Sequence, residues 1–181
     1  NFPWYNQTLS MRRNLTRSPI DNEHYAEAHG IKLRPTIYRR ILSLSHNNIT
    51  DLTTVQFTGI LDAITLTFNG LTTVGSETFQ NVQHLQVLDL SNNRLESIPE
   101  ATFHGLDKLV HLNLANNRLT SFPPETFCKL LSLETISLSN NQLASIGAGA
   151  FSQLISLEQL DVSSNQLTHL DEESVQVHSN R

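Results

Sequence analysis

The sequence predicts an α/β solenoid: a curved array with a short parallel sheet on its concave face and an irregular or 3-10 convex side. Three observations predict it. The segment of residues 85–108 is repeated in residues 109–132 and again in residues 133–156, and a fixed period of 24 residues is typical of stacked repeats. Each copy begins with the period-two alternation of a strand. Each copy also places an Asn at the same offset, just after that strand.

The chain of 181 residues divides into two parts. Residues 1–38 lie outside the repeat and are expected to form an N-terminal cap or a tail, because the end of an array exposes an apolar face and an unpaired strand edge. Residues 39–181 form an array of about six repeats. The last repeat loses its pattern after Leu170, with Val175 in place of Phe, so we expect the array to be an excerpt of a longer one.

Taken in order, the repeats share one set of apolar positions. Repeat one, residues 39–60, is two residues short, and its expected core is Leu42, Leu44, Asn47, Ile49, Leu52, Phe57 and Ile60. Repeat two begins at residue 61, and the later ones begin at residues 85, 109, 133 and 157. In the opening segment Leu88 and Leu90 should point inward and Asp89 outward. Parallel strands need a crossover, which the second half of each repeat supplies.

Two columns recur at fixed offsets. The Asn column could contact a ligand or form an internal hydrogen-bonded ladder, and the ladder is favoured because a buried amide satisfies backbone groups where the chain turns. Its members are Asn47, Asn69, Asn93, Asn117, Asn141 and Asn165. The Phe column could be an aromatic binding stripe, but a stacked spine in the core is favoured. Its members are Phe57, Phe79, Phe103, Phe127 and Phe151. Pro99, Pro123 and Pro124 fit a convex path outside the sheet.

Composition argues against several classes of function. The net charge is −5, and although residues 1–40 hold seven of the twelve Lys and Arg, the repeats are acidic, which argues against nucleic acid as a partner. No apolar run is long enough to span a membrane. The eight His residues are scattered, and there is no metal-ligand spacing or phosphate-binding loop. We therefore expect no enzyme activity, cofactor or metal.

Function is expected on the concave face, at positions two, three, five, seven and eight of each repeat. The candidate ligand-binding residues are Arg40, Asp62, Thr65, Phe68, Gln86, Asp89, His111, Asn113, Glu134, Ser137, Glu158 and Asp161. Glu134, Glu158 and Asp161 could steer a basic partner or form a solvated polar face. Phe68 could anchor a partner or pack on a neighbouring repeat. His111 could make binding pH-sensitive or be incidental.

Three Asn-x-Thr sequons, at Asn6, Asn14 and Asn48, indicate glycosylation and an extracellular location. The single cysteine, Cys128, excludes a disulfide within the chain. It could pair with another chain or remain a free, half-buried thiol.

The pattern LxxLxLxxNxLxx(I/F)PxxxFxxLxx resembles the leucine-rich repeat family in the 24-residue form typical of animal extracellular proteins. Phe in the crossover and the sequons are similar to Toll-type receptor ectodomains and secreted insect immune repeat proteins. The resemblance implies recognition of a protein ligand or co-receptor in innate immunity or cell-surface signalling. A structural or adhesion scaffold that forms homo- or heterodimers through the array is the alternative, and an intracellular repeat protein also stays open.

Overall fold

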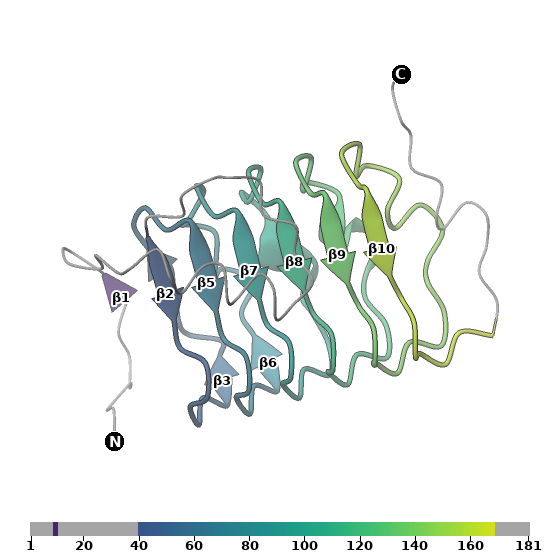
Figure 1. Cartoon of the computed structure of the whole chain (residues 1–181), viewed down its shortest axis with the longest axis horizontal. Coiled ribbons are helices and arrows are strands. Elements are labelled where there is room, and N and C mark those ends of the chain that lie inside the picture. Colours follow the sequence, from purple (N-terminus) through teal and green to yellow (C-terminus); the bar gives the residue numbers. More distant parts are fainter. Residues whose placement is uncertain (1–8, 11–39, 169–181) are drawn as a thin grey trace.

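A computed structural model describes residues 9–10 and 40–168 of the chain. Expectations for the N-terminal cap or tail, for Asn6 and Asn14, and for the array beyond residue 168 lie outside these residues. A six-stranded parallel sheet dominates the fold, with its strands adjacent in chain order (Figure 1). The strands are β2 (Ile41–Ser43), β5 (Ala63–Thr65), β7 (Val87–Asp89), β8 (His111–Asn113), β9 (Thr135–Ser137) and β10 (Gln159–Asp161). The predicted solenoid is confirmed.

The return paths carry the smaller elements. Two 3-10 helices lie on the return paths, η1 (Glu100–Phe103) and η2 (Pro124–Phe127), and they pack on each other. β3 (Asp51–Leu52) pairs in parallel with β6 (Thr73–Val74), and β1 (Leu9–Ser10) pairs in parallel with β4 (Phe57–Thr58). Pro99 and Pro123 each precede a 3-10 helix, which agrees with a convex path on which a missing N–H removes no hydrogen bond of the sheet.

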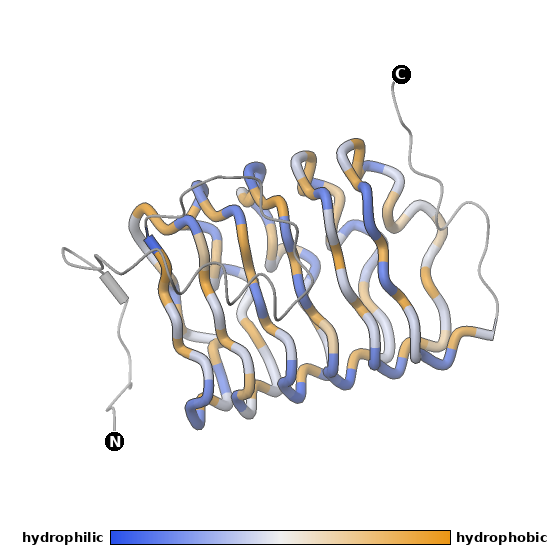
Figure 2. Tube along the Cα trace, in the orientation of Figure 1, coloured by the Kyte–Doolittle hydropathy of each residue, from blue (hydrophilic) through white to orange (hydrophobic). Residues whose placement is uncertain are grey.

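The core lies between the sheet and the return paths. Leu88 and Leu90 are fully buried, as predicted. Figure 2 shows hydrophobic and hydrophilic stretches alternating along each turn, which is why each turn buries one side against its neighbours. The Phe column is a buried spine: the rings of Phe127 and Phe151 stack with centroids 5.9 Å apart, and Phe57 and Phe79 stack at 5.6 Å. The prediction of a core spine rather than a binding stripe is confirmed.

The Asn column is the predicted internal ladder. Asn93 donates from Nδ2 to the carbonyls of Leu66 and Leu90, each at 3.0 Å. Its Oδ1 accepts the backbone N–H of Leu71 in the preceding repeat at 3.2 Å. Asn117 and Asn141 repeat these bonds one and two turns later. From Asn69 to Asn165 each amide therefore ties a strand end to the turn before it. Asn47 in repeat one is exposed and donates to the carbonyls of Leu44 and Ser45 in its own turn.

Two residues of the expected core of repeat one, Asn47 and Ile60, are exposed, so both predictions are wrong. Ile60 is 53% exposed, although it follows Phe57 by three residues, as Val82 follows Phe79 and Leu106 follows Phe103. In the full-length repeats, the residue three positions after the spine Phe closes a turn. For example, the Val82 N–H donates to the Phe79 carbonyl at 3.1 Å. In the shortened repeat one, Phe57 belongs to the extended strand β4, and Leu61 already begins the next repeat. The chain is therefore too short there to turn Ile60 inward.

Candidate functional site

The concave face, meaning the sheet face turned away from the Phe spine, carries most of the candidate residues in aligned rows. The parallel register pairs Thr65 with Asp89, and Asn113 with Ser137. The complete row across the sheet is Ser43, Thr65, Asp89, Asn113, Ser137 and Asp161. Because the strands are in perfect register, the 24-residue spacing in the sequence becomes lateral contact in space.

The exposure of the twelve candidate residues changes along this face. Four are buried: Asp62, Thr65, Asp89 and His111. Five are half-buried: Arg40, Gln86, Asn113, Glu134 and Ser137. Three are exposed: Phe68, Glu158 and Asp161. The accessible polar side chains of the face are therefore concentrated on β9 and β10, while the candidates on β5 and β7 make contacts within the chain.

Several candidates on the face hold its own backbone. The Oδ1 atoms of Asp89, Asn113 and Asp161 each accept the backbone N–H two residues later, at 2.8, 3.1 and 3.0 Å respectively. Such a side chain satisfies a backbone donor at the point where the strand ends. Asn113 also donates from Nδ2 to Asp89 Oδ2 at 3.2 Å, which links neighbouring repeats. Asp89 is fully buried in this network, so it acts first as a structural carboxylate.

Arg40 and Asp62 form a two-point ion pair between repeats one and two. Arg40 Nη2 donates to Asp62 Oδ1 at 3.0 Å, and Nε donates to Oδ2 at 3.2 Å. This arrangement suits the planar guanidinium, which matches a carboxylate with two parallel bonds. Each residue supplies a charged group to the other, so the first end of the face presents little uncompensated charge from this pair.

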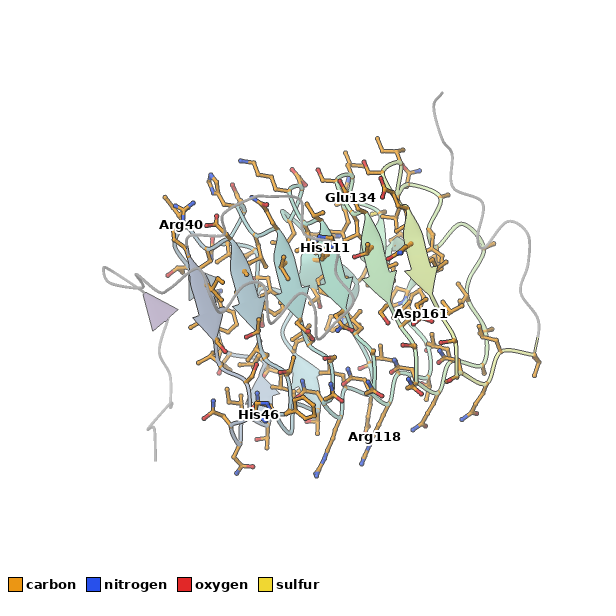
Figure 3. All side chains as sticks on the ribbon, viewed as in Figure 1. Arg40, His46, His111, Arg118, Glu134 and Asp161 are labelled. Atoms are coloured by element: carbon orange, nitrogen blue, oxygen red, sulfur yellow. The ribbon has the colours of Figure 1, made fainter. Side chains whose placement is uncertain are left out.

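His111 lies buried on β8, and its Nδ1 is 2.7 Å from the hydroxyl of Thr135 on β9. Burial lowers the pKa of His111, because the charged imidazolium loses solvation, and the carboxylate of Glu134 partly opposes that shift. Figure 3 places His111 and Glu134 on neighbouring strands of the face. The folded chain therefore favours the neutral imidazole.

The exposed end of the face is acidic. We call Glu134, Glu158 and Asp161 the acidic end patch; Glu134 directly precedes β9, Glu158 directly precedes β10, and Asp161 ends β10. Hydrogen bonds from the Ser163 hydroxyl and backbone, and from the hydroxyls of Ser139 and Ser137, lower the pKa of Asp161, against a smaller opposing effect of burial. Asp161 therefore keeps its negative charge well into the acidic range.

Two exposed apolar residues beside this patch were missed by sequence reasoning. Leu131 is 45% exposed and Ile155 is 53% exposed, each three residues before an acidic residue of the patch. They lie on adjacent turns, because the Ser156 hydroxyl donates to the Leu131 carbonyl at 2.8 Å. The signal was present in the sequence: the earlier repeats place Asp107 and Gln83 at this offset. We call Leu131 and Ile155 the apolar pair.

At the opposite corner of the face, Phe68 is exposed and stacks on His46, the equivalent residue of the preceding repeat. Their ring centroids lie 4.6 Å apart with an interplanar angle of 10°. We call these two residues the aromatic edge. Phe68 therefore packs on a neighbouring repeat, and half of its surface stays accessible; its role as an anchor for a partner stays a prediction. The sequon residue Asn48 is also exposed.

Across residues 9–10 and 40–168, no three His, Cys, Asp or Glu side chains gather in a group that could hold a metal ion. In the same residues, no helix has the length and apolar character needed to cross a membrane. Cys128 follows η2 as a half-buried free thiol. The sheet presents aligned and partly accessible side chains, an arrangement that suits recognition.

Comparison with known proteins matches more than half of the chain to family models of a repeat. A family model described as Leucine rich repeat matches residues 60–119 and 108–167. A second model, also described as Leucine Rich repeat, matches residues 40–52. These matches cover more than half of the chain and include all six strands of the sheet. No curated protein matches the chain.

Proposed function

Because the chain belongs to the leucine-rich repeat family, whose domains commonly mediate protein–protein interaction, we propose that it is a non-enzymatic extracellular recognition module. It binds a protein ligand or co-receptor through the concave face, in innate immunity or cell-surface signalling. The observation that carries this proposal is the acidic end patch, which holds the exposed carboxylates among the candidate residues of the face.

The patch defines the chemistry of the partner. Glu158 and Asp161 are exposed, Glu134 is half-buried, and the pKa of Asp161 is lowered, so the site stays negatively charged at neutral pH. A partner with Lys or Arg side chains at matching spacing is favoured, both in the rate of encounter and in register. Acidic or nucleic-acid partners are disfavoured by the same charge.

The apolar pair can contribute affinity that charged side chains alone do not provide. Charged groups at the rim of an interface contribute modestly to affinity, whereas desolvated apolar anchors contribute more. Leu131 and Ile155 lie three residues before Glu134 and Glu158 along the chain, and the partner we propose covers the pair as well as the acidic end patch. The partner we propose therefore presents a basic surface around an apolar centre.

The extracellular location is supported by the sequons. Asn48 and Thr50, the two essential residues of the third sequon, are both exposed, so this acceptor is accessible to modification. Free Cys128 gives no preference, because a single half-buried thiol occurs in either environment.

The proposal is tested by capturing partners from native extracellular fluid on the immobilised chain and identifying them by mass spectrometry. The informative variant is Glu158→Gln with Asp161→Asn. It removes two charges and keeps the strand-end hydrogen bond, since Asn113 makes that bond in its own repeat. We expect the specific partner to be recovered in much lower yield on this variant.

A matched control carries Glu100→Gln and Glu125→Gln. These exposed carboxylates lie on η1 and η2, so the control makes the same change in net charge away from the face. A partner captured equally by all three proteins would overturn the proposed site. Capture lost equally on both variants would mean that only overall charge matters, which also contradicts it.

An assembly scaffold is the second candidate, because the exposed apolar pair would also suit a second copy of the chain. Light scattering separates the two: a dimer that Leu131→Asp with Ile155→Asp converts to a monomer supports the scaffold. A strict monomer at high concentration removes it and leaves the pair to a different protein.

A further inference from the structure

The aromatic edge occupies a backbone conformation that is unfavourable for Phe68. His46 has φ +57° and Phe68 has φ +52°, both in the left-handed region. The same position of the later repeats holds Asn92, Asn116, Asn140 and Ser164, also at positive φ. Asn tolerates this region, whereas a bulky aromatic residue there is uncommon and strained. The left-handed backbone of the turn therefore disfavours Phe at residue 68.

Burial does not explain Phe68 either. The side chain is 50% exposed, and its ring stacks on His46, which is itself exposed. A strained, exposed aromatic residue that the fold does not need is an indication of function. What remains accessible is a flat aromatic surface just beyond the ends of β2 and β5, where Figure 3 shows His46.

The sequon residue Asn48 lies beside this surface. It follows His46 by two residues, so the two Cα atoms are within about 7 Å of each other. It is exposed, as is Thr50. The equivalent residue of the next repeat is Gly70, whose backbone N–H donates to the Ile49 carbonyl at 3.0 Å.

Gly70 leaves space where the other repeats do not. Its φ is not positive, and a Cβ there would make only ordinary contacts, with Thr50 Cγ2 at 3.4 Å and the Ile49 carbonyl oxygen at 3.8 Å. The backbone therefore does not require glycine. The later repeats carry Arg94 and Arg118 at this position, two long and exposed side chains. Because residue 70 has no side chain, the space next to Asn48 is open.

We propose that Asn48 carries an N-linked glycan whose first N-acetylglucosamine packs against the aromatic edge. In the secreting cell the amide nitrogen of Asn48 loses a proton and bonds to C1 of the first sugar, while the C1–O bond to the donor, a lipid-pyrophosphate-linked oligosaccharide, breaks and the lipid pyrophosphate leaves. The C–H face of the attached sugar covers the exposed ring of Phe68. Covering the ring removes apolar surface from water and offsets the backbone strain. The site is a glycan-supporting platform, separate from the acidic end patch at the other end of the sheet. This inference rests on the extracellular location in the proposed function.

The test uses the whole chain secreted from a eukaryotic host, as four proteins: the unchanged chain, Asn48→Gln, Phe68→Asn and the double variant. Phe68→Asn places in repeat two the residue type that repeats three to five already use, so it retains the fold. Glycopeptide mass spectrometry should find Asn48 occupied in the unchanged chain. The glycan should raise the Tm by about 3 °C when Phe68 is present and by less than about 1 °C in the Phe68→Asn variant.

Trimming the glycan to its first sugar should leave most of the stabilisation, because only that sugar reaches the platform. In the trimmed protein, NMR should show sugar protons shifted upfield by the ring current of Phe68, and Phe68→Asn should abolish the shift. An unoccupied Asn48, or an equal Tm increase with and without Phe68, would overturn the proposal. We expect the Asn48→Gln protein to capture the partner as the unchanged chain does. Failure of the glycan proposal is therefore distinguishable from failure of the recognition function.

Discussion

Thr78, Thr102 and Thr126 show how a single backbone N–H decides the state of a buried hydroxyl. The hydroxyl of Thr78 accepts the N–H of Gly75 at 3.0 Å and donates to the Leu52 carbonyl at 2.9 Å. In the next two repeats the residue at the Gly75 offset is Pro, which has no N–H. The hydroxyls of Thr102 and Thr126 are accordingly buried without a hydrogen-bond partner.

This difference predicts opposite effects of one substitution. Thr102→Val should stabilise the fold by about 1 kcal/mol, because it removes a buried polar group that has no partner. Thr78→Val should destabilise it by about 1–2 kcal/mol, because two hydrogen bonds are lost and the Gly75 N–H is left unpaired. Chemical denaturation measures both. Equal destabilisation by the two changes would mean that Thr102 has a partner in solution.

His111 gives the chain a pH dependence with a definite sign. Its pKa in the folded chain is below the ordinary value of 6.5, mainly through burial. Above pH 6.5 the imidazole is neutral in both states, and stability is unaffected. As the pH falls below 6.5 the unfolded chain takes up a proton that the folded chain resists, so the free energy of unfolding decreases, by at most about 1.4 kcal/mol per pH unit.

Denaturation curves at several values between pH 7 and pH 5 test this prediction. The slope of stability against pH should be shallower in His111→Gln, because that variant has no proton to resist. Since the pKa of Asp161 is lowered from 3.8, its own loss of stabilisation begins only below this range. Parallel curves for the two proteins would show that His111 titrates equally in both states.

At the scale of elements, the repeats are held together by backbone groups that side-chain amides satisfy. The 24-residue period, the strands, the Phe spine and the Asn ladder were predictable, since each is a residue type at a fixed offset with one evident physical role. The exposure of Ile60 was not. Repeat one lacks two residues. Without them, the segment that forms a turn in the full-length repeats is the extended strand β4 in repeat one. Pattern matching aligned Ile60 with Val82 although the chain between Phe57 and Leu61 is shorter.

The ladder predicts a graded response along the array. Asn117 is buried, and its amide bonds four backbone groups, among them the Leu95 N–H and the Leu90 carbonyl of the preceding repeat at 3.0 Å each. Asn47 is exposed in the first repeat, and within the described part of the chain its Nδ2 donates to the carbonyls of Leu44 and Ser45 in its own turn. Asn117→Ala should therefore cost about 3 kcal/mol and Asn47→Ala less than about 1 kcal/mol.

Thermal or chemical denaturation of the two variants gives the comparison directly, with Asn47→Ala serving as the matched control. Similar losses at both positions would indicate that the amides act locally, within their own turn, and not as links between repeats.

At the scale of the whole molecule, the candidate surface was only partly predictable. Residue spacing located the concave face and the acidic end patch. It did not show that Asp89 is buried in a strand-end network, because that depends on hydrogen bonds with neighbouring strands. It also passed over Leu131 and Ile155, which lie outside the five positions considered. The contact that we propose therefore lies at one end of the face, where exposed carboxylates and the apolar pair lie near each other along the chain.

The most direct test of this account is the dissociation constant of the captured partner, measured for the unchanged chain, for Glu158→Gln with Asp161→Asn, and for the Glu100→Gln with Glu125→Gln control. The account predicts an affinity about tenfold weaker for the first variant, equivalent to about 1.4 kcal/mol, with a reduced dependence on salt. The control should match the unchanged chain. An unaltered dissociation constant for the Glu158 and Asp161 variant would contradict recognition through the acidic end patch.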